Sequence, residues 1–365
     1  MNTPKVRILA SYLPQFHPIP ENDLWWGKGF TEWTNVRKAK PLFRGHYQPK
    51  VPTELGYYDL RMPEVRQAQA DLAREYGIEG FCYWHYWFGN GKQLLERPFN
   101  EVLASGVPDF PICLGWANHD WKDKQFSRKG SNRMLMKQEY PGVDDYVLHF
   151  TKVLPAFQDR RYVRVDLKPV FLIYDPIGLP DVSEFIRLWQ TLAREQGLEG
   201  IHFIANTHKI EDISRFRDMG FDAVNILRFF HFIKQELSLT ERASMKFSRV
   251  LLKRGHVYDY AQAARHFQGE EDKLDYCYPS LIPNWDHSPR SGRQGHIFVN
   301  SNPQEFKKHV KNVLEQVRHK DQEHRIVLLR SWNEWGEGNY VEPDLKYGRG
   351  FLEAIKSSID ELKVE

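Results

Sequence analysis

Short apolar runs with the character of buried strands alternate with amphipathic helical stretches along the whole chain, and this alternation restricts the possible folds most strongly. Eight such runs occur, at residues 7–13, 80–87, 111–116, 168–174, 201–206, 223–227, 278–285 and 325–329. Helical patterns occur at 62–76, 93–104, 144–157, 182–195, 213–219, 303–319 and 351–362. Asp181 is the predicted N-cap of the helix at 182–195. The pattern predicts an α/β fold, a (β/α)8 TIM-type barrel.

An internal repeat supports this prediction. The segment AREYGIEGF at 73–81 returns as AREQGLEGI at 193–201, and a looser copy, FRDMGFDA, lies at 216–223. Each copy has the order of a helix end, a capping glycine and a short loop into the next strand. Barrels of this kind reach several hundred residues as one unit, so we expect residues 1–365 to form a single catalytic domain.

Two long segments interrupt the alternation. Residues 14–61 form a long first βα loop rich in aromatic and turn residues, and loops of this length in compact domains are usually functional. Residues 228–275 form a second insertion, helical and mostly basic in pattern. It contains Lys246, Arg249, Lys253 and Arg254. Two interpretations of this insertion stay open: a solvated helical cover on one barrel edge, or a surface that contacts an anionic partner.

Charge and composition exclude several classes of protein. The chain has 51 Lys and Arg against 48 Asp and Glu, too small an excess for a nucleic-acid surface. Its three cysteines, Cys82, Cys113 and Cys277, predict no disulfide framework. No stretch reaches the roughly 18 apolar residues of a membrane span, and no signal peptide is evident, so we expect a cytoplasmic protein. The oligomeric state is left open.

The segment SWNEWGEG at 331–338, directly behind the last predicted strand, combines two carboxylates, two indoles and two glycines. Glu334 and Glu337 are an odd number of residues apart, so a strand would place them on opposite faces. Both can serve one site only if the chain turns there, and Gly336 and Gly338 favour such a turn. Paired carboxylates are what the cleavage of glycosidic bonds requires. The alternative is that these acids are solvated and the tryptophans belong to the core.

Other polar and aromatic residues gather where the predicted strands end, which is the face of such a barrel that carries the active site. The aromatic share of the chain is 14%, including 11 tryptophans, which exceeds the needs of a core and suggests a surface for stacking sugar rings. The predicted catalytic residues are Glu334 and Glu337. The predicted substrate-binding residues are Tyr12, Gln15, His17, Trp33, Tyr83, Trp84, His85, Tyr86, Trp116, Asn118, Asn206, Trp285, Asp286, Trp332, Asn333 and Trp335.

Metal and nucleotide sites are weaker hypotheses. His85, His119, His208 and His287 could meet at a barrel mouth, but no spacing typical of zinc ligands supports a metal. No phosphate-binding glycine loop follows a strand, and the chain has no Asp-x-Asp triplet for a metal-bound nucleotide sugar. We therefore predict no metal and no cofactor.

Four motifs together resemble the WbsX-like family: YLPQFH at 12–17, WWGKGFTEWTNV at 25–36, FCYWHYWF at 81–88 and WNEWGEG at 332–338. The resemblance covers nearly the whole chain. Proteins of this family occur in bacterial surface-polysaccharide and lipopolysaccharide O-antigen loci, are often labelled glycosyltransferases, and are related to glycoside hydrolase family 99.

The resemblance implies a retaining, endo-acting α-mannosidase-like glycoside hydrolase or transglycosylase that acts on an oligosaccharide or polysaccharide. It implies that Glu337 is the general acid and base and that Glu334 deprotonates the sugar 2-hydroxyl, which attacks the anomeric carbon. Those hydrolases have a histidine where this chain has Gly336. A cytoplasmic glycosyltransferase of O-antigen biosynthesis and a non-catalytic glycan-binding barrel are the alternatives.

The spacing of the two acids also predicts geometry. Acids three residues apart on one turn cannot easily approach a sugar ring from opposite faces. We therefore expect Glu334 and Glu337 to enter one cleft from the same side, at the carboxyl ends of the barrel strands. Trp84, Trp116 or Trp285 is expected across the cleft from them.

Overall fold

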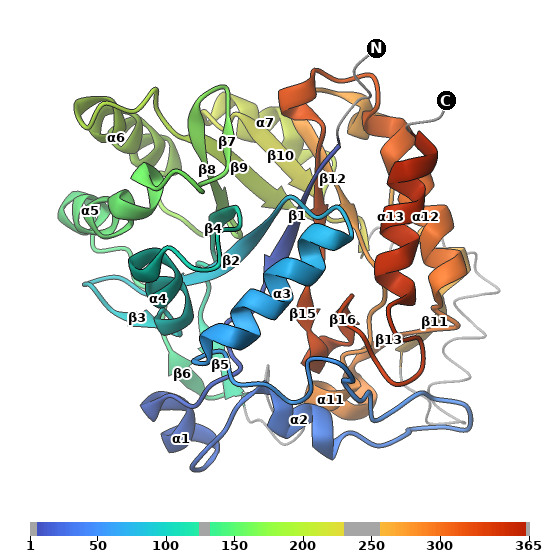
Figure 1. Ribbon diagram of the computed structural model, residues 1–365. Helices are drawn as coiled ribbons and strands as arrows, with labels where there is room; N and C mark the ends of the chain where they lie inside the picture. The colour runs from blue at the N-terminus through green and yellow to red at the C-terminus, as the bar shows by residue number, and fades with distance from the viewer. Residues whose placement is uncertain (1–5, 124–131, 230–255, 363–365) are drawn as a thin grey trace.

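The computed structural model describes residues 6–123, 132–229 and 256–362. Eight parallel strands form a closed barrel, in which each strand pairs with its neighbours in chain order and β1 pairs with both β2 and β14 (Figure 1). They are β1 Arg7–Tyr12, β2 Gly80–Trp87, β4 Ile112–Trp116, β8 Lys168–Ile173, β9 His202–Thr207, β10 Ala223–Ile226, β12 Cys277–Leu281 and β14 Ile326–Leu329. The register is set by pairs such as Leu9 with Gly80 and Arg7 with Ile326. The predicted (β/α)8 fold is confirmed.

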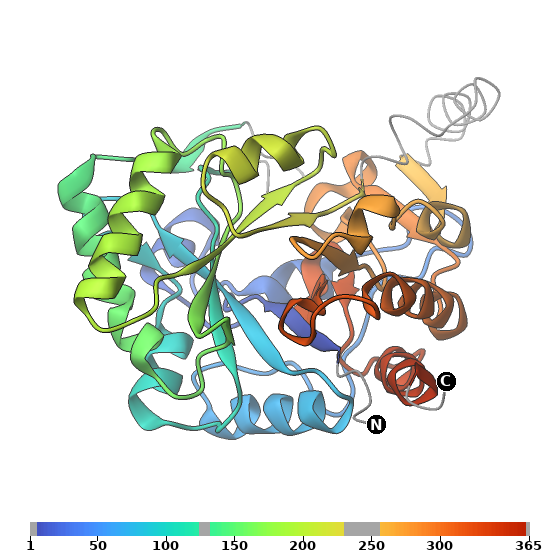
Figure 2. The same cartoon turned by 90° about the horizontal axis from the view of Figure 1, so that it is seen from above.

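The helices lie outside the strands and cover the barrel (Figure 2). The longer ones are α3 Pro63–Glu75, α4 Arg97–Ser105, α5 Val143–Gln158, α6 Val182–Glu195, α12 Pro303–Val317 and α13 Gly350–Leu362. Their apolar faces are buried against the strands, as Val313 and Leu314 of α12 illustrate. Burial of apolar surface of this kind is the main favourable contribution to the stability of such a layered fold.

The remaining helices and strands are short. The short helices are α1 Pro20–Trp26, α2 Glu32–Lys38, α7 Asp212–Asp218, α10 Tyr260–Ala264, α11 Ser288–Ser291, and the 3₁₀ turns η3 Glu270–Lys273, η4 Gly292–Gln294, η5 Gln322–His324 and η6 Trp335–Glu337. The short strands are β3 Gln93–Leu94, β5 Trp121–Lys122, β6 Met134–Met136, β7 Arg164–Val165, β11 His256–Asp259, β13 His296–Val299, β15 Asn333–Glu334 and β16 Asn339–Tyr340. The predicted first loop, 14–61, thus contains α1 and α2.

Two sequence-based boundaries were wrong, and one predicted cap makes no capping hydrogen bond. The helix expected at 93–104 begins only at Arg97, because residues 93–94 pair antiparallel with Tyr86 and Trp87 of β2. The strand expected at 278–285 ends at Leu281, ahead of Pro283, which has no N–H to donate. Asp181 precedes α6, but its side chain makes no capping hydrogen bond.

The insertion at 228–275 is described only at its two ends. Beyond residue 255 it continues as β11, which pairs in parallel with β13, and then as the short α10 and η3. The expected helical pattern therefore holds only in part for the described residues. Lys246, Arg249, Lys253 and Arg254 lie outside them, so both interpretations of the insertion, a solvated cover and a surface that contacts an anionic partner, stay open.

Candidate active site

The chain turns sharply behind β14, as the two glycines predicted. β15 and β16 pair antiparallel with η6 between them, so that Glu334 and Glu337 lie on one hairpin. Gly338 has a φ of 60°, and a Cβ atom there would lie 2.7 Å from Asp286 Cβ. A side chain at 338 would therefore be both strained and obstructed.

This hairpin lies at the carboxyl ends of the barrel strands, beside a cavity of about 260 Å³. Glu334 and Glu337 both line the cavity, and each side chain is only 16% exposed. The cavity is also lined by Leu13, Gln15, Trp84, Tyr86, Ala117, His119, Trp121, Tyr174, Leu227, Trp285, His287, Arg290, Arg330 and Asn339. The two acids therefore share one cleft, and Trp84 and Trp285 are among its walls.

Arg290 holds the two acids together. Its Nη1 donates to Glu337 Oε1, its Nη2 lies 4.0 Å from Glu334 Oε1, and its Nε donates to Glu32 Oε1 at 2.9 Å. Glu32 is completely buried, and Arg290 nearly so. His287 Nε2 lies 3.4 Å from the same oxygen of Glu337. One guanidinium thus contacts three carboxylates, and this places the paired acids on one side of the cleft.

The surroundings separate the pKa values of the two acids. Burial, and then the negative charge of Glu337, raise the pKa of Glu334 to about 8. Burial also opposes ionisation of Glu337, but the Arg290 guanidinium and the His287 hydrogen bond outweigh it and lower its pKa to about 2. At neutral pH the pair therefore carries one proton, and that proton rests on Glu334. The family resemblance implies the reverse placement of the proton when substrate is bound, because there Glu337 is the acid and Glu334 is the base.

Arg330 forms the cavity wall beside Trp84. Its guanidinium lies 5.0 Å from the centre of the Trp84 indole, and its Nη2 donates to Asn206 Oδ1 and, at 3.3 Å, to Asn225 Oδ1. Asn206 therefore supports the cavity from behind and does not line it. Gln15 lines the cavity, and its buried amide nitrogen has no hydrogen-bond partner among the described residues.

Several predicted binding residues lie away from the cavity, packed behind it or in the layer between strands and helices. Tyr12 donates to Gln69 of α3, Tyr83 packs on Phe99 of α4, and His85 pairs with His149 of α5 at 2.8 Å. The others of this kind are His17, Trp33, Trp116, Asn118, Asp286, Trp332, Asn333 and Trp335. Of the residues proposed to bind substrate, Gln15, Trp84, Tyr86 and Trp285 lie in the cavity wall.

Some of these buried residues have a clear structural role. Asn333 ties the hairpin to the end of β1, because its Oδ1 accepts from Leu13 N at 2.7 Å and its Nδ2 donates to Leu13 O at 3.1 Å. Trp335 stacks on Tyr340 with ring centres 3.7 Å apart, and Trp116 Nε1 donates to Trp87 O. The contacts of Asn333 and Trp335 fix the hairpin that carries the acids, and that of Trp116 joins β4 to the end of β2.

Sequence reasoning missed Arg290, Arg330 and Asn339 as site residues. Arg290 lies on α11, and its partner Glu32 lies at the start of α2, inside the long first loop. No local pattern links two residues so far apart in the chain. Arg330 was visible as a charged residue directly after an apolar strand, which is the position where barrel sites are built.

The described residues hold no group of three His, Cys, Asp or Glu side chains arranged to bind a metal ion. His119 and His287 line the cavity, whereas His85 lies in the outer layer and His208 Nδ1 contacts Leu227 O. No helix within the described ranges is both long and apolar enough to cross a membrane.

Known proteins resemble this chain in sequence. The sequence pattern of the family described as glycosyltransferase WbsX matches residues 8–355. The chain is 37% identical over 359 residues to an uncharacterized protein WxcX of Xanthomonas campestris pv. campestris strain B100, and equally to that of strain ATCC 33913. The match covers 96% of this chain and 49% of each relative, so the chain spans about half the length of these curated relatives.

Solved structures share the fold. A GH99 endo-alpha-mannosidase from Bacteroides thetaiotaomicron, solved in complex with BIS-TRIS-propane, superposes with a TM-score of 0.58 at 14% sequence identity and covers 98% of both chains. A structure described as a glycoside hydrolase-like protein gives the same TM-score at 15% identity, over 97% of this chain and 94% of that one.

Proposed function

We propose that this chain, which belongs to the glycosyltransferase WbsX family, cleaves or rearranges glycosidic bonds with Glu334 and Glu337 as its paired acids. The observation that carries the proposal is the pair itself. Two largely buried carboxyl groups with opposite pKa shifts line one cavity at the carboxyl ends of the barrel strands. Catalytic acids and bases need this separation of pKa values, and structural acids do not.

The chemistry follows from the position of the pair. In a displacement by an enzyme carboxylate, or by water in an inverting enzyme, the two acids act from opposite faces of the sugar. Here a single guanidinium contacts both acids, so they approach the sugar from one side. This arrangement favours attack on the anomeric carbon by the sugar's own 2-hydroxyl, which Glu334 deprotonates while Glu337 protonates the departing oxygen. Water then opens the resulting anhydro sugar, and the configuration is retained overall.

These roles require a change when substrate binds. Glu337 can donate a proton only if its contacts with Arg290 and His287 weaken, because those contacts keep its pKa low. Sugar hydroxyls that bind these two side chains would weaken them. The one proton of the pair, which rests on Glu334 in the free protein, can then move to Glu337.

We propose an α-mannoside in the interior of a polysaccharide as the substrate. Support comes from the likeness of the fold to the endo-alpha-mannosidase and from the indoles of Trp84 and Trp285 in the cavity wall. A neutral sugar presents apolar faces of its ring, which stack on indole rings, and hydroxyl groups, which bind amides such as that of Gln15.

Release of reducing ends from α-mannan, measured for the unaltered chain and two variants, tests the proposal. We expect Glu337→Gln and Glu334→Gln each to lower turnover by about 10²–10⁴-fold, the usual contribution of a general acid or base. Glu323→Gln, a change of an exposed acid at the other end of the barrel, serves as the matched control and should leave turnover unchanged. Undiminished cleavage by the Glu337 variant would overturn the assignment.

The name of the family favours a second candidate, the transfer of a sugar from an activated donor to a growing glycan. Calorimetric titration separates the two. Binding of a nucleoside diphosphate sugar in the micromolar range would support transfer. Binding of mannan oligosaccharides together with no heat from nucleotide sugars would support hydrolysis or transglycosylation.

A further inference from the structure

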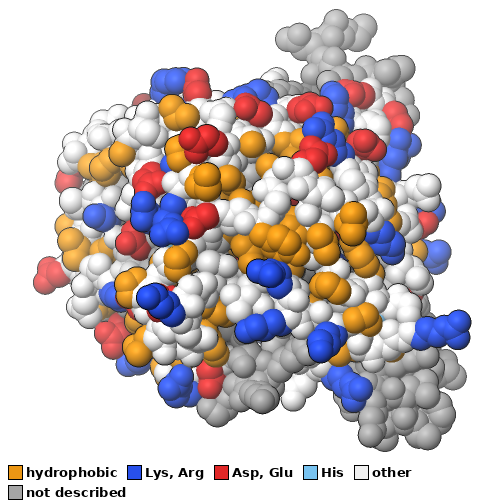
Figure 3. Space-filling view, turned by 60° about the horizontal axis from the view of Figure 1, so that its bottom comes forward, with side chains coloured by type: hydrophobic (Ala, Val, Ile, Leu, Met, Phe, Trp, Pro, Cys, Tyr) orange, Lys and Arg blue, Asp and Glu red, His pale blue; other side chains and the backbone are white. Residues whose placement is uncertain are grey.

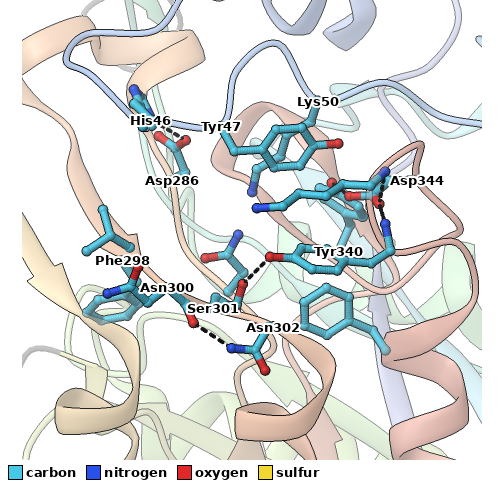
Figure 4. A pocket seen from close by; sticks show the side chains of 16 residues that line it. His46, Tyr47, Lys50, Asp286, Phe298, Asn300, Ser301, Asn302, Tyr340 and Asp344 are labelled. Atoms are coloured by element: carbon cyan, nitrogen blue, oxygen red, sulfur yellow. Dashed lines mark hydrogen bonds and ion pairs between the residues drawn. The ribbon is translucent and has the colours of Figure 1, made fainter.

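A second cavity, of about 270 Å³, lies behind the hairpin that carries the paired acids (Figure 4). Residues of the first loop, of the segment after β13 and of the segment after β16 surround it. In Figure 4, Tyr47 and Lys50 lie on one side, Tyr340 and Asp344 on another, and Asn300, Ser301 and Asn302 below them. It shares no lining residue with the cavity of Glu334 and Glu337.

The walls of this second cavity combine aromatic faces with amides, as sugar-binding sites do. Tyr47, Tyr340, Tyr347, Phe298 and Phe351 supply the rings, and Asn284, Asn300 and Asn302 supply the amides. Rings offer faces for stacking, and amides both donate and accept hydrogen bonds.

Two ammonium groups face the same space. Lys50 is 3% exposed, donates from Nζ to Gly338 O at 3.1 Å and lies over the ring of Tyr340. Lys346 Nζ lies 4.8 Å from the ring centre of Tyr47 and 4.7 Å from that of Tyr347. Among the residues that the structure describes, neither ammonium has a carboxylate oxygen within 4.0 Å.

The carboxylates in the wall are already bound to other groups. Asp286 Oδ2 accepts from His46 Nε2 at 2.8 Å and from Gln48 Nε2 at 2.6 Å. Asp344 Oδ2 accepts from Tyr340 at 2.6 Å, while its Oδ1 accepts from the backbone N–H groups of residues 346 and 347. Asp286 and Asp344 favour the charge of Lys50 from a distance, and Lys346 opposes it. An anion between the two ammonium groups would stabilise both.

The surface next to the cavity is basic as well. Residues 33–53 contain five Lys or Arg and no Asp or Glu. Four of them, Arg37, Lys38, Lys40 and Arg44, are exposed and directly precede the lining residues 45–47. Figure 3 shows Lys and Arg side chains spread over the lower part of this end of the molecule, with few Asp and Glu among them. A chain with repeated negative charges would be attracted to such a surface.

We propose that the second cavity binds an acidic sugar residue, one that carries a carboxylate or a phosphate, between Lys50 and Lys346. The sugar hydroxyls bind the amides of the wall, and the anionic group binds the two ammonium groups. The proposal rests on the proposed function only in taking the ligand to be a saccharide. It adds that the polysaccharide contains acidic sugar units besides the neutral mannoside whose bond is cleaved.

The second cavity also contacts the catalytic hairpin from behind. Lys50 donates to Gly338 O, and the backbone N–H of Asp286 donates to Glu337 O at 2.6 Å. An acidic sugar bound by Lys50 therefore lies one residue away from the paired acids.

Isothermal calorimetry on the doubly inactive variant Glu334→Gln/Glu337→Gln tests the proposal, because binding is then measured without turnover. The probes are glucuronate and mannose 6-phosphate, compared with mannose and inorganic phosphate. We expect at least one acidic sugar to bind at least tenfold more tightly than mannose and than inorganic phosphate, since charged hydrogen bonds and those between sugar hydroxyls and amides act together. The probe that binds more tightly shows whether the cavity prefers a sugar with a carboxylate or one with a phosphate.

Two lysine variants locate the binding. Lys346→Gln, a change of an exposed side chain, should weaken binding of the acidic sugar about tenfold, and Lys50→Met should weaken its binding further. Lys356→Gln on the outside of α13 is the control and should have no effect. Equal binding of mannose, equal binding of inorganic phosphate, or affinity that neither lysine variant lowers would each overturn the proposal. None of these results depends on whether Glu334 and Glu337 are catalytic.

Discussion

The carboxylate of Glu32 occupies the space that a side chain at Gly336 would need. A Cβ atom on Gly336 would lie 1.6 Å from Glu32 Oε1 and 3.0 Å from Arg290 Nε. The backbone of Gly336 has no positive φ, so glycine is required here for close approach alone. A side chain as large as histidine at this position would force Glu32 away from Arg290. The glycine and the buried ion pair therefore belong together in this chain.

Gly336→Ala is expected to lower the free energy of unfolding by about 1–3 kcal/mol, the usual cost of an added carbon in a filled space. The cost should be smaller when Glu32 is also changed to Ala, because the obstructing carboxylate is then gone. Chemical denaturation of the two single variants and the double variant measures this coupling. Additive losses would show that Glu32 does not limit residue 336.

The pH dependence of kcat/KM reports the free protein, in which the pair carries one proton. Because the pKa of Glu334 is raised to about 8 and that of Glu337 is lowered to about 2, this one-proton form prevails between the two values. Above about pH 8 both acids ionise, so kcat/KM should be level near neutrality and fall on the alkaline side. A fall already complete by pH 6 would contradict the shifts.

The alkaline limb should also respond to Glu337. The negative charge of Glu337 is one cause of the raised pKa of Glu334. In Glu337→Gln that charge is absent, so the pKa of Glu334 should fall. Because Glu334 acts as the base, the residual activity of this variant, measured against pH, should rise as Glu334 ionises and should not show the alkaline fall of the unaltered chain. An unchanged limb would mean that another group titrates there.

A substrate with a leaving group that departs without protonation, such as an aryl α-mannoside extended by one sugar, separates the two roles. The variant of the general acid should regain most of its turnover on this substrate, and the variant of the base should not. We expect the recovery for Glu337→Gln. Recovery for Glu334→Gln would mean that Glu334 is the acid and Glu337 the base, in agreement with a proton that rests on Glu334 in the free protein.

The alternation of side chains along a strand explains which site residues the sequence could identify. On β2, Trp84 and Tyr86 face the cavity, whereas Tyr83 and His85 face the helices outside the barrel. All four residues are aromatic or polar and lie at the predicted strand end, so composition alone could not separate them. The period of two in a strand does separate them once one inward residue is known.

The strands and the paired acids could be predicted because they are local features, an apolar run and a glycine-rich turn. The contacts of Arg290 with Glu32 and Glu337 join the first loop, α11 and the last hairpin. Such contacts depend on closure of the barrel, and a single sequence carries no local pattern for them. The same applies to the second cavity, whose lining comes from residues 45–50, 284–302 and 340–351.

The indoles in the cavity wall should contribute to glycan binding, and those in the outer layer should not. Trp84→Ala and Trp285→Ala are each expected to weaken binding of a mannan oligosaccharide about tenfold, since a buried apolar surface of this size is lost. Trp116→Phe removes an indole that packs on Phe185 outside the barrel, so it should lower Tm and leave the affinity unchanged. Titration calorimetry and thermal unfolding of the three variants measure both effects.

The anomeric configuration of the first product, followed by proton NMR during cleavage of an α-mannan oligosaccharide, tests the central claim most directly. Two acids on one side of the sugar, with attack by its own 2-hydroxyl, predict that the α-anomer appears first and the β-anomer only later by mutarotation. Glu337→Gln should release neither at a comparable rate. Initial release of the β-anomer, or α-anomer formed equally fast by the Glu337 variant, would contradict the account.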